Sequence, residues 1–148
     1  MLPITVVIAD RQPAHRAACL RLLRPVKGVR VVGEAGNGFD ALAATRLKPR
    51  ILLLDLTLSL GPSSALLPVI RRKSPGTKVI LLTDRASDAR ILDALAHGVP
   101  GYLERRSLRA FLAKAVRLVD AGEGWVPRQM VTKMVMRLRA RHEKSPGR

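Results

Sequence analysis

The stretch Ile51-Leu52-Leu53-Leu54-Asp55 decides the fold of this chain. Four aliphatic side chains follow one another without a polar interruption, and a carboxylate comes directly after them. A strand with one face in water would alternate apolar and polar residues, so this run is typical of a strand buried on both faces of a parallel sheet. The position of Asp55 predicts that the strand ends at a polar edge of that sheet.

Four other runs rich in Val, Ile and Leu resemble this stretch. The five predicted strands are 4–9, 29–34, 50–55, 78–83 and 100–103. Helical patterns separate them, at 13–23, 38–47, 63–73, 87–96 and 107–121. Pro13 suits a first helical turn, Ser87 and Ser107 are expected N-caps, and Gly98 and Gly122 are expected helix ends. Strands that alternate with helices predict an open parallel α/β sheet with right-handed crossovers.

The alternation stops after Gly122. Residues 127–140 form one more amphipathic pattern, and its apolar stripe consists of Met130, Val131, Met134, Val135 and Leu138. We therefore expect a domain over residues 1–122 and a linker helix with a tail over 123–148. The segment 130–138 is predicted to be a connector outside the domain core, with its stripe buried on the domain or on a partner chain.

Composition limits the class of protein. The chain has 148 residues, of which 47% are hydrophobic, and its apolar runs are much shorter than the roughly 20 residues of a membrane span. No signal peptide is apparent, and Cys19 is the only cysteine, so no intrachain disulfide can form. We expect a cytoplasmic protein without membrane contact, in which Cys19 is a buried core thiol.

The formal net charge of +16 is large for this length. Such a field attracts nucleic acids and other polyanions without sequence preference. Aromatic residues make up only 3% of the chain, which disfavours a stacking platform for single strands. An arginine-rich solvated surface is the alternative explanation of the charge.

Polar residues follow four of the predicted strands. In open α/β sheets ligands bind beyond the carboxyl ends of the strands, so these side chains are predicted to share one site. They are Asp10, Arg11, Asp55, Thr83, Glu104 and Arg105.

Other kinds of site fit the sequence poorly. No glycine-rich phosphate loop follows the first strand, no serine lies in a nucleophile elbow, and the three histidines are isolated from one another. Hydrolase, oxidoreductase and zinc-site interpretations are therefore disfavoured. We assign no catalytic residue and expect a regulatory protein rather than an enzyme.

Over residues 3–122 the chain resembles the receiver domains of two-component response regulators. The segments that carry the resemblance are 6–10, 51–56, 79–83 and 98–103. Residues 31–38, 101–103 and 121–125 resemble the LuxR-type subfamily. The resemblance implies a flavodoxin-like sheet of order 2-1-3-4-5 with helices on both faces, and a C-terminal helix-turn-helix domain that binds DNA.

The resemblance also implies roles for the residues at the sheet edge. Asp55 would be the phosphoacceptor of a phosphorelay, with a sensor histidine kinase as partner. Asp10, Asp55 and the backbone carbonyl of Thr57 would hold Mg²⁺. Thr83 and Arg105 would contact the phosphoryl group.

Tyr102 would swing inward in response to phosphorylation. The signal would then reach the surface formed by 87–96, 100–103 and 107–121, which we expect to form a homodimer. Opposite charges on this surface are predicted to pair across a two-fold axis. They are Asp88, Arg90, Asp93, Arg109, Lys114 and Arg117.

The chain departs from the family pattern at four places around this site. Arg11 replaces a second acid, Arg105 a lysine, Asp84 a small residue and Ser59 a proline. These changes favour slow phosphorylation and weak Mg²⁺ binding. We predict that Arg11 pairs with Asp55 in place of the metal. The alternative is that the Arg11 side chain points to solvent. Two rival functions remain, a stand-alone protein-interaction module and a direct nucleic-acid binder.

Overall fold

The computed structural model describes residues 2–59, 66–84 and 87–144. Five parallel strands form one sheet in the order β2-β1-β3-β4-β5, which confirms the predicted fold class. The strands are β1 Ile4–Ala9, β2 Val29–Ala35, β3 Ile51–Asp55, β4 Lys78–Thr83 and β5 Gly101–Glu104. Every residue of β3 is buried, as a central strand covered on both faces requires.

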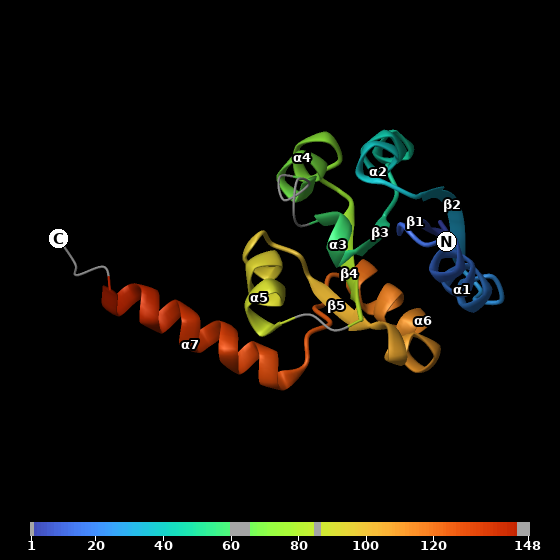
Figure 1. The fold of residues 1–148 in the computed structure, drawn as a ribbon. Coiled ribbons are helices and arrows are strands. Elements are labelled where there is room, and N and C mark those ends of the chain that lie inside the picture. The colour runs from blue at the N-terminus through green and yellow to red at the C-terminus, as the bar shows by residue number, and fades with distance from the viewer. Residues whose placement is uncertain (1, 60–65, 85–86, 145–148) are drawn as a thin grey trace.

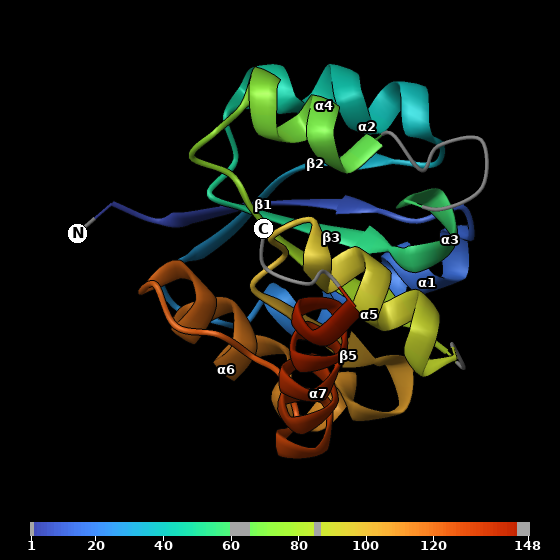
Figure 2. The same cartoon turned by 90° about the vertical axis from the view of Figure 1, so that its left-hand side faces the viewer.

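Helices cover both faces of the sheet (Figures 1 and 2). On one face lie α1 Pro13–Leu23 and α6 Leu108–Asp120, and on the other α2 Gly38–Ala44, α4 Leu66–Lys73 and α5 Asp88–Ala96. Alternate residues of the strands feed the two cores, because successive side chains point to opposite faces. Val6, Ile8 and Leu53 pack with α1 and α6, whereas Val7 and Leu52 pack on the other side.

The helix ends follow local chemistry. Pro13 occupies the first turn of α1 as predicted, and the Ser87 hydroxyl accepts a hydrogen bond from the backbone N–H of Arg90 at the start of α5. Gly98 and Gly122 have φ of 86° and 97°, a left-handed conformation that glycine adopts without strain. Cys19 is fully buried, and burial raises the pKa of its thiol to about 11.

Some predicted boundaries were wrong. The sequence analysis missed α3 Leu56–Ser59, a single turn directly after β3. A 3-10 turn, Arg105–Ser107, precedes α6, and the Ser107 side chain makes no capping hydrogen bond. The predicted helix 38–47 divides into α2 and the 3-10 turn Thr45–Leu47. Residues 63–65 of the predicted third helix lie outside the described residues.

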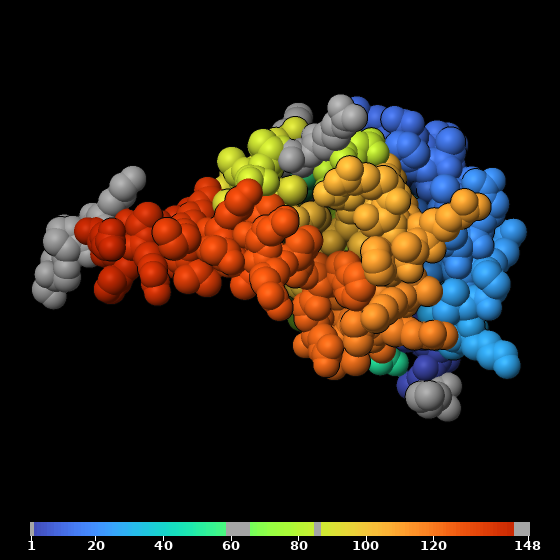
Figure 3. Space-filling view, turned by 90° about the horizontal axis from the view of Figure 1, so that it is seen from below, coloured from blue at the N-terminus to red at the C-terminus, as the bar shows by residue number. Residues whose placement is uncertain are grey.

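The last helix, α7 Arg128–Lys144, projects from the domain beside α5 (Figures 1 and 3). Its first turn is not a mere connector, since Met130 is only 5% exposed and belongs to the same core cluster as Tyr102. The stripe predicted over 130–138 is thus buried on the domain at Met130. Among the described residues, no helix is both long and apolar enough to cross a membrane. Residues 145–148 of the predicted tail are outside the described part of the chain.

Candidate functional site

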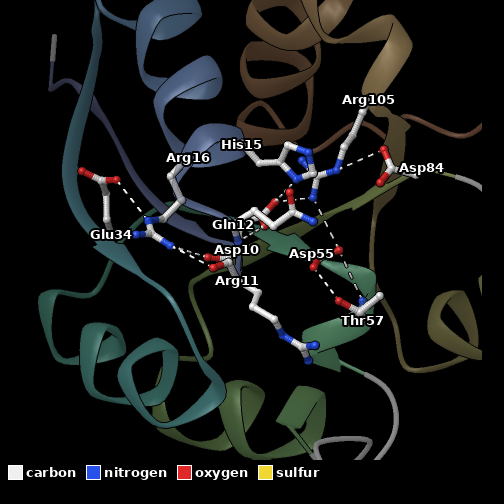
Figure 4. Close-up of polar contacts among 10 residues, drawn as sticks. All are labelled: Asp10, Arg11, Gln12, His15, Arg16, Glu34, Asp55, Thr57, Asp84 and Arg105. Carbon is white, nitrogen blue, oxygen red and sulfur yellow. Dashed lines mark hydrogen bonds and ion pairs between the residues drawn. The ribbon is translucent and has the colours of Figure 1, made fainter.

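The carboxyl ends of the central strands bring the predicted polar residues to one edge of the sheet. Ala9 of β1 lies opposite Leu54 of β3, so the residues that follow them, Asp10 and Asp55, emerge side by side. On the neighbouring strand β4, Thr83 is buried and 4% exposed. Figure 4 shows the polar contacts that converge at this edge.

Asp10 is the most deeply buried acid of the site, with a side chain that is 1% exposed. Its Oδ1 accepts a hydrogen bond of 2.9 Å from the backbone N–H of Gln12. Its Oδ2 accepts from the guanidinium of Arg105 and lies 3.5 Å from Nδ1 of His15. A buried carboxylate needs such partners, because removing an unpaired charge from water is costly.

Arg105 is the cation of the site. It follows β5 directly, and its side chain is only 11% exposed. The guanidinium bonds Asp10, reaches Oδ1 of Asp55 at 3.5 Å and lies 3.4 Å from Asp84 (Figure 4). Its Nη1 atom is buried without a hydrogen-bond partner among the described residues. One guanidinium therefore links three carboxylates and keeps a spare donor.

Asp55 is held from a second side by α3. The Thr57 hydroxyl donates to Oδ2 of Asp55 at 2.5 Å, and the Thr57 backbone N–H lies 3.4 Å from Oδ1. The sequence analysis singled out the Thr57 carbonyl and missed this hydroxyl. With an exposed side-chain fraction of 12%, Asp55 is the acid of the buried pair that a small reagent can reach more easily.

Arg11 does not play the part that the sequence analysis gave it. Its side chain is exposed, and Figure 4 shows it directed away from Arg105 and the acids bound to it. No ion pair between Arg11 and Asp55 occurs in the described part of the chain. Arg105 makes the pairing with Asp55 that was expected of Arg11. The turn after β5 directs the Arg105 side chain over the edge of the sheet, toward Asp55.

Tyr102 lies in β5, three residues before Arg105. It is 6% exposed and packs in the core cluster that contains Ile91 of α5 and Met130 of α7. Burial, helped by the negative charges of Glu104 and Asp88, raises the pKa of its phenol above the usual value. Tyr102 is therefore a neutral side chain between the polar site and the α5–α7 contact.

Two residues of the site were missed. His15 and Arg16 lie in the first turns of α1, where Arg16 donates to the backbone carbonyl of Asp10 at 2.7 Å and pairs with Glu34 at 3.4 Å. Their spacing of five and six residues after Asp10 places them over the strand end, which is a signal that the sequence contained. No group of three or more His, Cys, Asp or Glu side chains forms a metal site among the described residues.

The comparison with known proteins decides the family. Residues 6–117 match the response regulator receiver domain. The chain belongs to this family. Response regulator protein VraR of Staphylococcus epidermidis is 29% identical over 143 residues, which cover 96% of this chain and 68% of that relative.

Solved receiver structures agree with this fold. The signal receiver domain of the putative response regulator NarL from Mycobacterium tuberculosis superimposes with a TM-score of 0.76 at 29% identity, covering 83% of this chain and all of that one. A two-component response regulator of the LuxR family from Aurantimonas sp. SI85-9A1 gives a TM-score of 0.79 at 24% identity, covering 91% of this chain and 97% of that one. At that identity the second likeness concerns the fold alone.

The chain is thus a receiver domain of a two-component response regulator, with LuxR-family proteins among its structural neighbours. Receiver domains usually pair with sensor kinases, typically use Mg²⁺ at an acidic pocket and are generally not enzymes. Asp10 and Asp55 form the buried acidic pair of such a pocket here.

Proposed function

We propose that this receiver domain controls a LuxR-type DNA-binding output domain and that Asp55, its phosphoacceptor, is phosphorylated slowly. Slow phosphorylation is inferred from the position of Arg105. Its guanidinium donates a hydrogen bond to Asp10 and lies 3.5 Å from Asp55. The guanidinium already offsets part of the negative charge of the two acids that would otherwise attract a divalent cation. The attraction between Arg105 and Asp55 is on the order of 4 kcal/mol at an effective dielectric of about 20, before the cost of desolvation is subtracted.

The residues of this pocket do not fit Mg²⁺ while Arg105 is in place. Mg²⁺ requires near-octahedral coordination by oxygen and binds proteins through carboxylates. Asp10 accepts a hydrogen bond from Arg105, and Asp55 lies in ion-pair distance of the same guanidinium. Arg11 stands where the family has another acid. We infer that the metal would have to displace Arg105 from Asp10, which is its most buried partner.

The pocket nevertheless retains features that suit a phosphoryl group. Nη1 of Arg105 is a spare buried donor, and the Thr57 hydroxyl and the Thr83 side chain border the same edge of the sheet. We infer that Arg105 would hold the phosphoryl oxygens of a modified Asp55 as a guanidinium can, with two hydrogen bonds. A sensor histidine kinase would be the phosphodonor.

Phosphorylation of the intact chain tests this proposal. Wild type, Asp55→Asn and the double variant Arg11→Asp/Arg105→Lys are incubated with acetyl phosphate and Mg²⁺, and the mass gain is mapped by mass spectrometry. We expect the double variant, which restores two of the four family residues, to react roughly tenfold or more faster than wild type. Asp55→Asn should gain no mass. Equal rates for wild type and the double variant would contradict slow phosphorylation.

The output function needs a separate test. The protein made from its native reading frame is compared with the 148-residue chain in DNA footprinting. We expect sequence-specific protection only by a protein longer than this chain, whereas residues 1–148 alone should bind DNA weakly, without sequence preference, and lose the binding with added salt. Specific protection by the 148 residues alone would instead favour a direct nucleic-acid binder.

A second candidate function is a phosphorylation-independent interaction module. The Arg105 network favours it, because the network holds one arrangement of the pocket without phosphate. The homodimer predicted for the α5–β5–α6 surface belongs to either function. Charge reversal of Arg109 and Arg117 to Glu should weaken self-association in sedimentation if that surface is the dimer interface.

A further inference from the structure

Strand β5 is in contact with two distant parts of the molecule. At its carboxyl end Arg105 forms ion pairs with Asp10, Asp55 and Asp84. Residues 123–144 leave the domain along its outer edge: Trp125 forms a bridge with Gly101 of the same strand, and the beginning of α7 lies beside α5 (Figures 1 and 2). This segment, which ends in α7, is called the arm below.

The arm joins the sheet through Trp125. The backbone N–H of Trp125 donates to the carbonyl of Pro100 at 3.0 Å, and the N–H of Tyr102 donates to the Trp125 carbonyl at 3.1 Å. A Cβ on Gly101 would stand 2.7 Å from the Trp125 carbonyl oxygen, closer than real Cβ atoms come. Glycine is therefore required at position 101 for the arm to lie so close to β5.

Beyond Trp125 the arm packs on α5. Met130 is buried with Tyr102, Lys133 pairs with Asp88, and Arg137 pairs with Asp93 at 2.7 Å. These two acids were predicted to pair across a dimer axis, and here they pair within the chain. The arm thus covers part of the surface through which the receiver was expected to signal.

The contact between the arm and α5 involves few side chains. Both ion pairs are partly exposed to solvent, and Nη1 of Arg137 is buried without a hydrogen-bond partner among the described residues. A cleft of about 430 Å³ is lined by Phe111 and Trp125 at the side of α6. Val131, Val135 and Leu138 are 45%, 45% and 64% exposed and are not among the residues packed in the core cluster of Met130. A small change in β5 can therefore shift the balance between the docked and the released arm.

We propose that the arm is a detachable cover of the α5–β5 face and that the Arg105 network sets its position through β5. While Arg105 stays on the three acids, the carboxyl end of β5 is fixed, and Gly101 and Tyr102 keep the register that binds Trp125. When Arg105 leaves the acids, this register loosens, the arm detaches, and Asp88, Asp93 and the Met130 site become accessible. The proposal goes beyond the proposed function and requires neither phosphate nor DNA.

Trp125 is the only tryptophan of the chain, so its fluorescence reports the docked state. We compare quenching by acrylamide in wild type, Arg105→Ala and the matched control Arg106→Ala, whose native side chain is 83% exposed. Gly101→Ala serves as the reference for a released arm. We expect Arg106→Ala to match wild type and Arg105→Ala to lose Trp125 protection to the level of Gly101→Ala.

Circular dichroism shows which variants remain folded. If Arg105→Ala does not fold, Asp84→Ala replaces it, because Asp84 is a 67% exposed partner of Arg105 and its loss weakens the network without leaving a buried charge. For Asp84→Ala we expect acrylamide quenching of Trp125 that lies between the values of wild type and Gly101→Ala. A folded network variant with wild-type quenching would overturn the coupling. If Lys133→Glu and a folded Gly101→Ala both show the same acrylamide quenching of Trp125 as wild type, that result would overturn the proposal that the arm detaches.

Discussion

The polar site and the arm use the same kind of interaction in two very different environments. Arg105 and Asp10 have side chains that are 11% and 1% exposed, whereas Lys133 and Asp88 are 49% and 52% exposed. A buried ion pair is costly to break because the remaining charge cannot return to water, while a solvated pair contributes little. The comparison predicts that the polar site resists disruption more than the arm does, and the link that we propose between them runs through β5.

The largest effect is expected for Arg105→Ala. This change leaves Asp10 buried with only the Gln12 amide and His15 as partners, so the free energy of unfolding should fall by about 3 kcal/mol at neutral pH. Urea denaturation followed by circular dichroism measures it, and Arg106→Ala is the control. A loss equal to that of the control would mean that the buried network contributes no more than a surface pair.

A smaller effect is expected at the apolar anchor of the arm. Met130→Ala removes the buried side chain that meets Tyr102 and should weaken arm docking by about 2 kcal/mol. Hydrogen exchange of the α7 amides measures this change. Met136→Ala is matched in chemistry, but its native side chain is 58% exposed, so exchange should stay close to wild type. Equal exchange in both variants would show that Met130 does not anchor the arm.

The smallest effect is expected for the exposed ion pairs. Lys133→Glu should weaken arm docking by about 0.5 kcal/mol, and the double change with Asp88→Lys should restore it. Because the pair is solvated, the difference should shrink in 1 M salt. Arg141→Glu, on an exposed part of α7, is the control for net charge. Trp125 quenching at both salt concentrations distinguishes a specific pair from a general charge effect.

The sequence predicted the sheet well because burial leaves a clear pattern. The aliphatic runs around Val6, Leu53 and Ile80 lie in the core, and Asp10, Asp55 and Thr83 lie at the carboxyl ends of their strands as expected. The single turn of α3 was missed because four residues are too few to show a helical period.

The identity of the pocket cation was harder to predict. Arg11 and Arg105 both follow strands, and sequence position alone does not tell which side chain turns inward. The 3-10 turn after β5 decides it, since it returns Arg105 over the sheet edge while Arg11 stays exposed. The part of the C-terminal stripe that packs on the domain was likewise not predictable, since Met130 is buried whereas Val131 and Val135 of the same stripe are 45% exposed.

The central claim is that Arg105 acts as the built-in cation of the receiver pocket. Calorimetric titration of Mg²⁺ into wild type, Arg105→Ala and Arg106→Ala tests it most directly. We predict no binding at millimolar Mg²⁺ by wild type and Arg106→Ala, and measurable binding by Arg105→Ala, in which Asp10 and Asp55 are free of the guanidinium. Binding of Mg²⁺ by wild type as tight as by Arg105→Ala would contradict the claim.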